Sequence, residues 1–94
     1  MFRFSENADG KSKRENLIIA KEMLDKLVDV VPTLLSSSVN IDSSANPTNF
    51  DLVLVSEFES YEALNEYLIH PAHKAVGEFI KKVRIDRACV DYEF

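Results

Sequence analysis

The sequence predicts a single α+β domain, and two patterns lead to this prediction. Short segments in which apolar and polar residues alternate are typical of β-strands, and longer segments with apolar residues every three or four positions are typical of amphipathic helices. These segments follow one another in the order strand, helix, strand, strand, helix, strand. A chain of 94 residues has room for one compact domain, residues 1–94, and not for a second.

Four segments have the pattern of strands. In "MFRF", Phe2 and Phe4 lie on one side of an extended chain and Arg3 lies on the other. The same alternation occurs over residues 34–42 and 88–94, and "FDLVLVSEF" is the strongest candidate because it is apolar on both faces. The residues that we expect to share a face are Leu35, Val39 and Ile41 in the second strand, Phe50, Leu52, Leu54 and Phe58 opposite Val53 and Val55 in the third, and Ala88, Val90, Tyr92 and Phe94 in the fourth.

Two segments have the pattern of helices. After the polar loop "SENADGKSK", Ser12 and Glu15 have the spacing of a capping box, in which each side chain bonds the backbone amide of the other. We expect one helix from there to Pro32, with an apolar face made of Leu17, Ala20, Leu24, Leu27, Val28 and Val31. The second helical segment begins after Ser60, a favourable N-cap, and is interrupted at His70-Pro71, where a new helix starts at an angle.

Composition predicts that the chain has a partner. The chain is 46% apolar, and its strand candidates are apolar on both faces. One layer of helices covers only one face of a sheet, so the other face needs a second cover. The simplest cover is an identical subunit, and we therefore expect a homodimer.

Charge and hydropathy exclude several other classes. The net charge is −5 with no stripe of Lys or Arg, so we expect no binding to nucleic acid. No segment approaches the roughly 18 apolar residues of a membrane span, and "MFRFSENADGKSK" lacks the features of a signal peptide. Cys89, the one cysteine, forms no disulfide within the chain. These features are typical of a cytoplasmic protein that does not bind membranes.

The order of elements matches the ferredoxin-like βαββαβ topology. With that order in place, "ADGKSKREN", "SEFESYEALNEYLIHPAHKAV" and "DRACVDYEF" resemble the stress-responsive A/B barrel domain (Dabb) family over nearly the whole chain. The resemblance implies a dimeric α/β barrel, in which the sheets of two protomers close on each other with the helices outside. It also implies a first strand that has several residues before the equivalent of "MFRF".

The resemblance further implies a candidate catalytic pair. Many members of the family have no assigned reaction, but a plant member cyclises a linear polyketide by an aldol reaction without metal or organic cofactor. Its catalytic tyrosine and histidine correspond to Tyr67 and His73 in "YLIHPAH". A further pocket histidine of that enzyme corresponds to Leu52 here, which weakens the transfer of its reaction to this chain.

Two functions therefore stay open at this stage. In the first, which the sequence favours, the protein has no assigned activity and is a cofactor-free module that binds a small molecule or a partner, with His73 and Tyr67 as packing residues. In the second, His73 removes a proton next to a carbonyl group of a small keto compound, and Tyr67 donates a hydrogen bond to the developing oxyanion. We expect no metal site, because Pro71 interrupts the helix between His70 and His73 and the chain has no cysteine cluster.

The sequence also suggests side chains for the two surfaces that these functions need. The candidate residues for lining a pocket for an apolar or keto ligand, which would otherwise be packed core, are Phe2, Phe4, Leu24, Val28, Leu52 and Leu54. The candidate residues for packing between the two protomers are Val53, Val55, Val90 and Tyr92.

Overall fold

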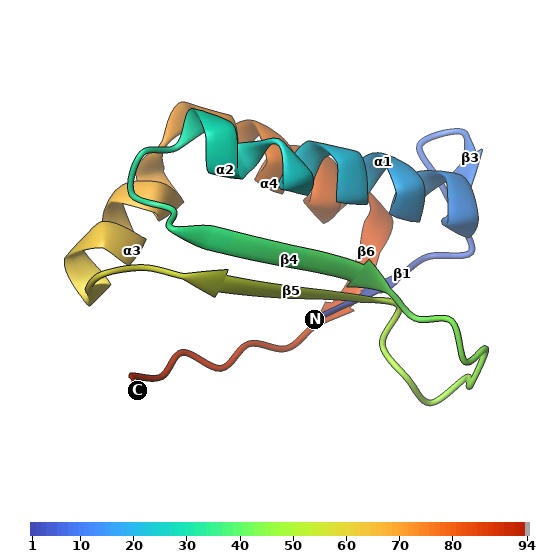
Figure 1. Cartoon of the computed structure of the whole chain (residues 1–94). Helices are drawn as coiled ribbons and strands as arrows, with labels where there is room; N and C mark the ends of the chain where they lie inside the picture. The colour runs from blue at the N-terminus through green and yellow to red at the C-terminus, as the bar shows by residue number, and fades with distance from the viewer. Residues whose placement is uncertain (94) are drawn as a thin grey trace.

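The computed structural model describes residues 1–93, and it consists of a four-stranded antiparallel sheet with helices on one face (Figure 1). The strands lie in the order β4-β5-β1-β6, with bounds Ser36–Ile41, Leu52–Glu57, Phe2–Phe4 and Arg84–Arg87. The helices that lie over the sheet are α1 (Lys13–Asp25), α2 (Leu27–Val30) and α4 (Pro71–Val83), while α3 (Tyr61–Ile69) connects β5 to α4 at one end (Figure 1). This is the predicted ferredoxin-like α+β topology.

The polar loop after β1 contains a small hairpin that we did not predict. Strands β2 (Asn7–Ala8) and β3 (Lys11–Ser12) pair through a two-residue turn at Asp9 and Gly10, whose φ angles are 54° and 76°. Two central residues with positive φ are the requirement of a type I′ turn, and Asp-Gly is among the sequences that satisfy it best. The dipeptide was therefore the signal for this hairpin.

Helix α1 begins as predicted. Ser12 accepts a hydrogen bond from the backbone amide of Glu15, and the Glu15 carboxylate accepts one from the backbone amide of Ser12, which completes the capping box. The prediction of one continuous helix up to Pro32 is wrong, because the chain turns at Lys26 and the last turn is the separate helix α2. The turn points Leu27 into the core and leaves Val28 exposed.

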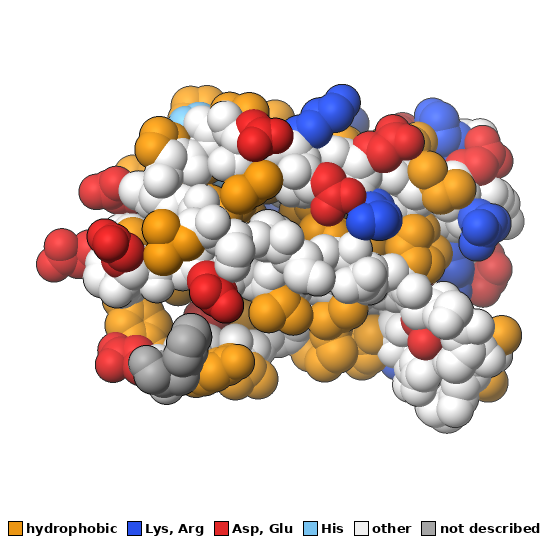
Figure 2. Space-filling model, in the orientation of Figure 1, with side chains coloured by type: hydrophobic (Ala, Val, Ile, Leu, Met, Phe, Trp, Pro, Cys, Tyr) orange, Lys and Arg blue, Asp and Glu red, His pale blue; other side chains and the backbone are white. Residues whose placement is uncertain are grey.

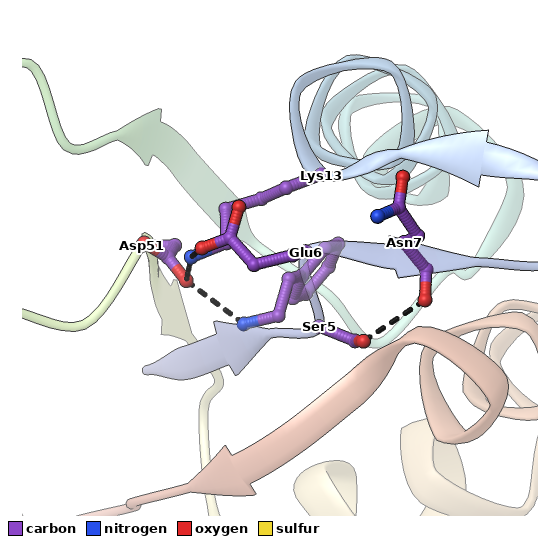
Figure 3. A network of polar contacts seen from close by, with 6 residues as sticks. Ser5, Glu6, Asn7, Lys13 and Asp51 are labelled. Carbon is purple, nitrogen blue, oxygen red and sulfur yellow. Dashed lines mark hydrogen bonds and ion pairs between the residues drawn. The ribbon is translucent and has the colours of Figure 1, made fainter.

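The start of α1 is tied to the sheet by a polar network (Figure 3). The Lys13 ammonium lies 3.2 Å from the Glu6 carboxylate and 3.3 Å from the Asp51 carboxylate. Asp51 also accepts a hydrogen bond of 2.8 Å from the backbone amide of Phe4. Burial lowers the pKa of Lys13, but the hydrogen bonds and charges of the two carboxylates outweigh it, so the pKa is raised. The network fixes α1 over β1 and engages Asp51 on the helix side of the sheet.

The predicted second strand begins later than expected. Strand β4 starts at Ser36, and Leu35 precedes it with 55% of its surface exposed. Val39 is buried under α1 and Ile41 is partly buried against the core, whereas Leu35, which we expected to share their face, lies outside the strand and does not join the core. The chain between Val31 and Leu35 still follows the irregular path that leaves α2, and alternation alone does not determine where a strand begins.

The prediction of a last strand over residues 88–94 is also wrong. Strand β6 starts at Arg84, directly after α4, and ends at Arg87. The backbone of Ala88 exchanges hydrogen bonds with Met1, and residues 89–93 then extend past the partner strand without forming a strand of their own. Alternation is not sufficient for a strand, because the backbone groups also need a neighbour. Phe94, which also belonged to this prediction, lies outside the described residues.

The core lies between the helices and one face of the sheet. Its buried apolar side chains come from every main element except β6, and they are Phe4, Leu17, Ala20, Leu24, Leu27, Val31, Leu34, Val39, Leu52, Tyr67, Val76, Ile80 and Val83. The opposite face of the sheet has no helix over it among the described residues, and the β4–β5 loop and the segment after β6 both project on that side (Figure 1). We call it the open face. In the part of the chain that the structure describes, no helix has the length and hydropathy needed to cross a bilayer.

Candidate functional site

The junction between α3 and α4 brings the two predicted catalytic side chains together. Helix α3 ends at Ile69, His70 adopts an extended conformation, and α4 starts at Pro71. The Nδ1 atom of His70 accepts a hydrogen bond of 3.0 Å from the backbone amide of Ala72, so His70 caps α4. Six residues along one straight helix would place Tyr67 and His73 on different sides, but the change of direction places their ring centroids 4.4 Å apart.

A backbone hydrogen bond orients the His73 ring. Its Nδ1 atom lies 3.2 Å from the carbonyl oxygen of Leu68. A carbonyl oxygen only accepts, so Nδ1 carries the proton, and in the neutral ring Nε2 keeps its lone pair. Burial lowers the pKa of His73, and the Leu68 carbonyl opposes that shift by stabilising the protonated ring. His73 is therefore a neutral base at neutral pH, with Nε2 as its basic atom.

Tyr67 is held between two rings. It is 4% exposed, and its ring centroid lies 5.1 Å from that of Phe58 on the side of β5. Burial raises the pKa of Tyr67, so its hydroxyl stays protonated and is able to donate a hydrogen bond. Within residues 1–93, no group forms a hydrogen bond with this hydroxyl.

The residues suggested for a ligand pocket do not line a common hollow. Phe4, Leu24 and Leu52 are buried in the core, Phe2 and Leu54 pack against it, and Val28 is exposed. Two hollows of the described chain lie instead around the β4–β5 loop, and neither is lined by Tyr67 or His73. One has a volume of about 390 Å³ and shares Leu52 with the suggested set.

The residues suggested for packing between protomers lie on the surface. Val53 and Val55 alternate with Leu52 and Leu54, so they point to the open face, where they are 37% and 54% exposed. Val90 and Tyr92 are also exposed, in the segment that follows β6. Figure 2 shows hydrophobic side chains along the lower edge of the molecule, between this segment and the β4–β5 loop.

Sequence reasoning missed one feature of the open face. Arg3 projects there from β1, and its guanidinium lies 4.8 Å from the centroid of the Phe50 ring, which lines the 390 Å³ hollow. The signal in the sequence was a single basic residue in a short apolar strand. Among the described residues, no group of three or more His, Cys, Asp or Glu side chains has the arrangement needed to hold a metal ion.

The fold and the helix junction define the chain as a two-layer ferredoxin-like α+β protein with an open sheet face. It is matched by the family model "Stress responsive A/B Barrel Domain" over residues 1–94, and the chain belongs to that family. The resemblance inferred from its sequence motifs is thereby confirmed. No protein with a curated description matches the chain.

Two solved structures are similar to the chain. A dimeric protein of unknown function and ferredoxin-like fold from Bacteroides fragilis is 28% identical, with a TM-score of 0.79, and the match covers 99% of this chain and 89% of that one. A dimeric ferredoxin-like protein of unknown function from Thermobifida fusca is 22% identical, with a TM-score of 0.83, and the match covers 100% of this chain and 85% of that one. They support the fold, and no specific activity is assigned through the family or through either structure.

Proposed function

We propose that the protein is a cytoplasmic homodimer that binds a small molecule without a cofactor, and that the two protomers meet through their open faces. The observation that carries the proposal is the pair Val53 and Val55, which are exposed on β5, an inner strand of the sheet. Apolar side chains at the centre of a sheet face are normally covered. The dimeric state of the B. fragilis protein, which is 28% identical, supports a second copy as the cover.

The segment after β6 supports the same assembly. Val90 is 81% exposed although its sequence alternates like a strand. The segment projects on the open side of the sheet (Figure 1). We propose that Val90 and Tyr92 pack, together with Val53 and Val55, against the partner protomer.

Light scattering with matched variants tests the dimer. At micromolar concentration we expect about twice the chain mass of 10.7 kDa. Val55→Asp should yield a folded monomer, because it places a charge in a desolvated interface. Val30→Asp is the control: Val30 on α2 is 53% exposed, nearly as much as Val55, and its substitution should leave the dimer intact. A wild-type monomer, or dissociation by both variants alike, would contradict the proposed interface.

The second candidate function is an enzyme, and the orientation of His73 favours it. The hydrogen bond to Leu68 leaves Nε2 as the basic atom of His73. The Tyr67 ring, which carries the protonated hydroxyl, lies next to the His73 ring. This pair has the chemistry for proton abstraction next to a carbonyl, with Nε2 taking the proton and the phenol stabilising the enolate oxygen. The reaction class would be cyclisation or isomerisation of a small keto compound.

Proton exchange tests the enzyme function. Exchange of the α-protons of cyclohexanone with D₂O, followed by NMR, should be accelerated by the wild-type protein. His73→Asn should lose this acceleration by about 100-fold or more, the usual contribution of a general base. Tyr67→Phe should also slow the exchange, while Tyr61→Phe, at an exposed position of α3, should not. Equal exchange rates in the wild type and His73→Asn would remove His73 as the base.

A further inference from the structure

Arg3 is a cation without a counter-ion in the described chain. It projects to the open face from β1, an inner strand of the sheet. Its guanidinium makes one hydrogen bond to the described residues, 3.3 Å from Nη2 to the carbonyl oxygen of Thr48, and lies over the Phe50 ring. Its Nε atom is buried and has no partner in residues 1–93. A guanidinium has five N–H donors, so most of its binding capacity is unused.

Neither of the nearest acidic residues along the strands forms an ion pair with Arg3 in the described chain. Asp86 is opposite Arg3 on β6, but its Oδ1 atom accepts from the backbone amide of Arg87 at 2.8 Å. Asp51 precedes β5 and is held by Lys13 and by the amide of Phe4 (Figure 3). No carboxylate of residues 1–93 lies within 4.0 Å of the Arg3 guanidinium.

A hollow of suitable size lies beside Arg3. Its volume is about 390 Å³, within the range of about 300–1,000 Å³ that is typical of small-molecule sites. Its lining includes the apolar side chains Ile41, Phe50, Leu52 and Val53, and also Thr48. Arg3 does not line the hollow itself, but it contacts two residues that do, Phe50 and Thr48, so its guanidinium lies next to the hollow.

The one acidic residue in the lining is already satisfied within its own loop. Asp42 accepts hydrogen bonds from the Ser44 hydroxyl at 3.0 Å and from the Asn49 amide at 3.3 Å. These neutral donors satisfy the carboxylate oxygens inside the β4–β5 loop, while the negative charge of Asp42 remains. The hollow therefore combines a partly apolar lining, which also includes Asn40 and Asn49, with a neighbouring cation that has no carboxylate partner in residues 1–93.

We propose that this hollow binds a small organic carboxylate. The carboxylate would accept from the Arg3 guanidinium, whose planar donors match its two oxygens, and the apolar part of the ligand would lie against Ile41, Phe50 and Val53. The proposal names the ligand class of the small-molecule binding proposed above and rests on it. A bound carboxylate would also balance the charge of Arg3 on the proposed dimer face, where an unpaired charge would be costly.

Hexanoate and 1-hexanol test the proposal, because they share an apolar chain and differ in the carboxylate. Titration calorimetry with the full chain should show that hexanoate binds more tightly than 1-hexanol. Arg3→Gln should weaken hexanoate at least about tenfold, the loss expected for a hydrogen-bonded ion pair, and should leave 1-hexanol nearly unchanged. Arg3→Lys should recover only part of the affinity, because it keeps the charge and loses the planar pair of donors. Lys82→Gln, an equal change of charge on the exposed side of α4, is the control and should have no effect.

Four results would overturn the carboxylate site. The first is equal hexanoate affinity in wild type and Arg3→Gln, and the second is an equal loss in Lys82→Gln. The third is a folded Arg3→Gln variant that becomes monomeric in light scattering. In that case the group that pairs with Arg3 would belong to the partner protomer and not to a ligand. A wild-type monomer that still binds hexanoate through Arg3 would contradict the dimer and support the site, since one chain supplies all the lining residues. The fourth is a stable dimer that binds no carboxylate, which would overturn the site and support the dimer.

Discussion

The two faces of β5 differ although their residues alternate along six positions of one strand. On the helix side, Leu52 is 2% exposed and packs among the core residues, whereas Val55 on the open side is 54% exposed. Both side chains belong to types that are normally buried. The difference shows that one layer of helices covers only one face, and it is the reason for proposing a second protomer over the other.

The two faces also differ in where their polar groups lie. On the helix side, the polar network of Lys13, Glu6 and Asp51 is internally paired. On the open side, Arg3 has no carboxylate partner within the described chain. A charge paired within the chain stabilises the fold of one protomer, while an unpaired one on an open face is available to a ligand.

The largest expected effect comes from the helix side of β5. Leu52→Ala should lower the free energy of unfolding by about 2–5 kcal/mol, since it leaves a cavity in a closed core. Val53→Ala, one residue along, should cost much less in the separated protomer because its side chain is already partly solvated. Urea unfolding of both variants in the background of the monomeric Val55→Asp protein measures the difference. Equal losses of unfolding free energy in the two variants would mean that the two faces of β5 do not differ in burial.

A medium effect is expected where the helical cover begins. Ser12→Ala removes the capping box of α1 and should cost about 1 kcal/mol of unfolding free energy. Ser36→Ala, at an exposed position of β4, is the matched control and should stay within about 0.5 kcal/mol of the wild type. Thermal unfolding measures both. If Ser12→Ala were as stable as the control, the hydrogen bonds at the start of α1 would contribute nothing to the stability of the protein.

The smallest effect is a pH dependence that arises at the helix junction. Burial lowers the pKa of His73 below its usual 6.5, so the unfolded chain takes up a proton at a higher pH than the folded chain. The stability from the neutral ring is complete above pH 6.5 and is lost as the pH falls through the folded pKa. We expect His73→Gln to flatten the stability profile below that pH, because it removes the titrating ring. An unchanged slope would assign the acid sensitivity to other groups.

Local signals in the sequence predicted much of the fold correctly. The capping box of Ser12 and Glu15, the N-cap at Ser60 and the break at Pro71 depend on atoms within a few residues of one another. The chain therefore forms them wherever it folds. The alternation in β5 likewise predicted that Leu52 and Leu54 lie on the face opposite Val53 and Val55.

Other features depended on residues far apart in the chain. Strand β6 begins at Arg84 because β1 pairs with it there, and the later alternation around Val90 does not become a strand within residues 1–93. The proximity of Arg3 to Phe50 joins residues 47 positions apart, and no local pattern indicates it. The catalytic pair proposed at Tyr67 and His73 lies between these two cases. The sequence indicated its spacing, but the orientation of the His73 ring came only from the structure.

By itself the sequence determined the topology and the starts of α1, α3 and α4, and it predicted a cover for both faces of β5, because periodicity and capping act over short distances. Only the tertiary structure decided where the last strand begins, which hollow lies open and which cation has no partner. These properties depend on strand pairing and on side chains that meet across the sheet, and such contacts exist only once the whole chain has packed.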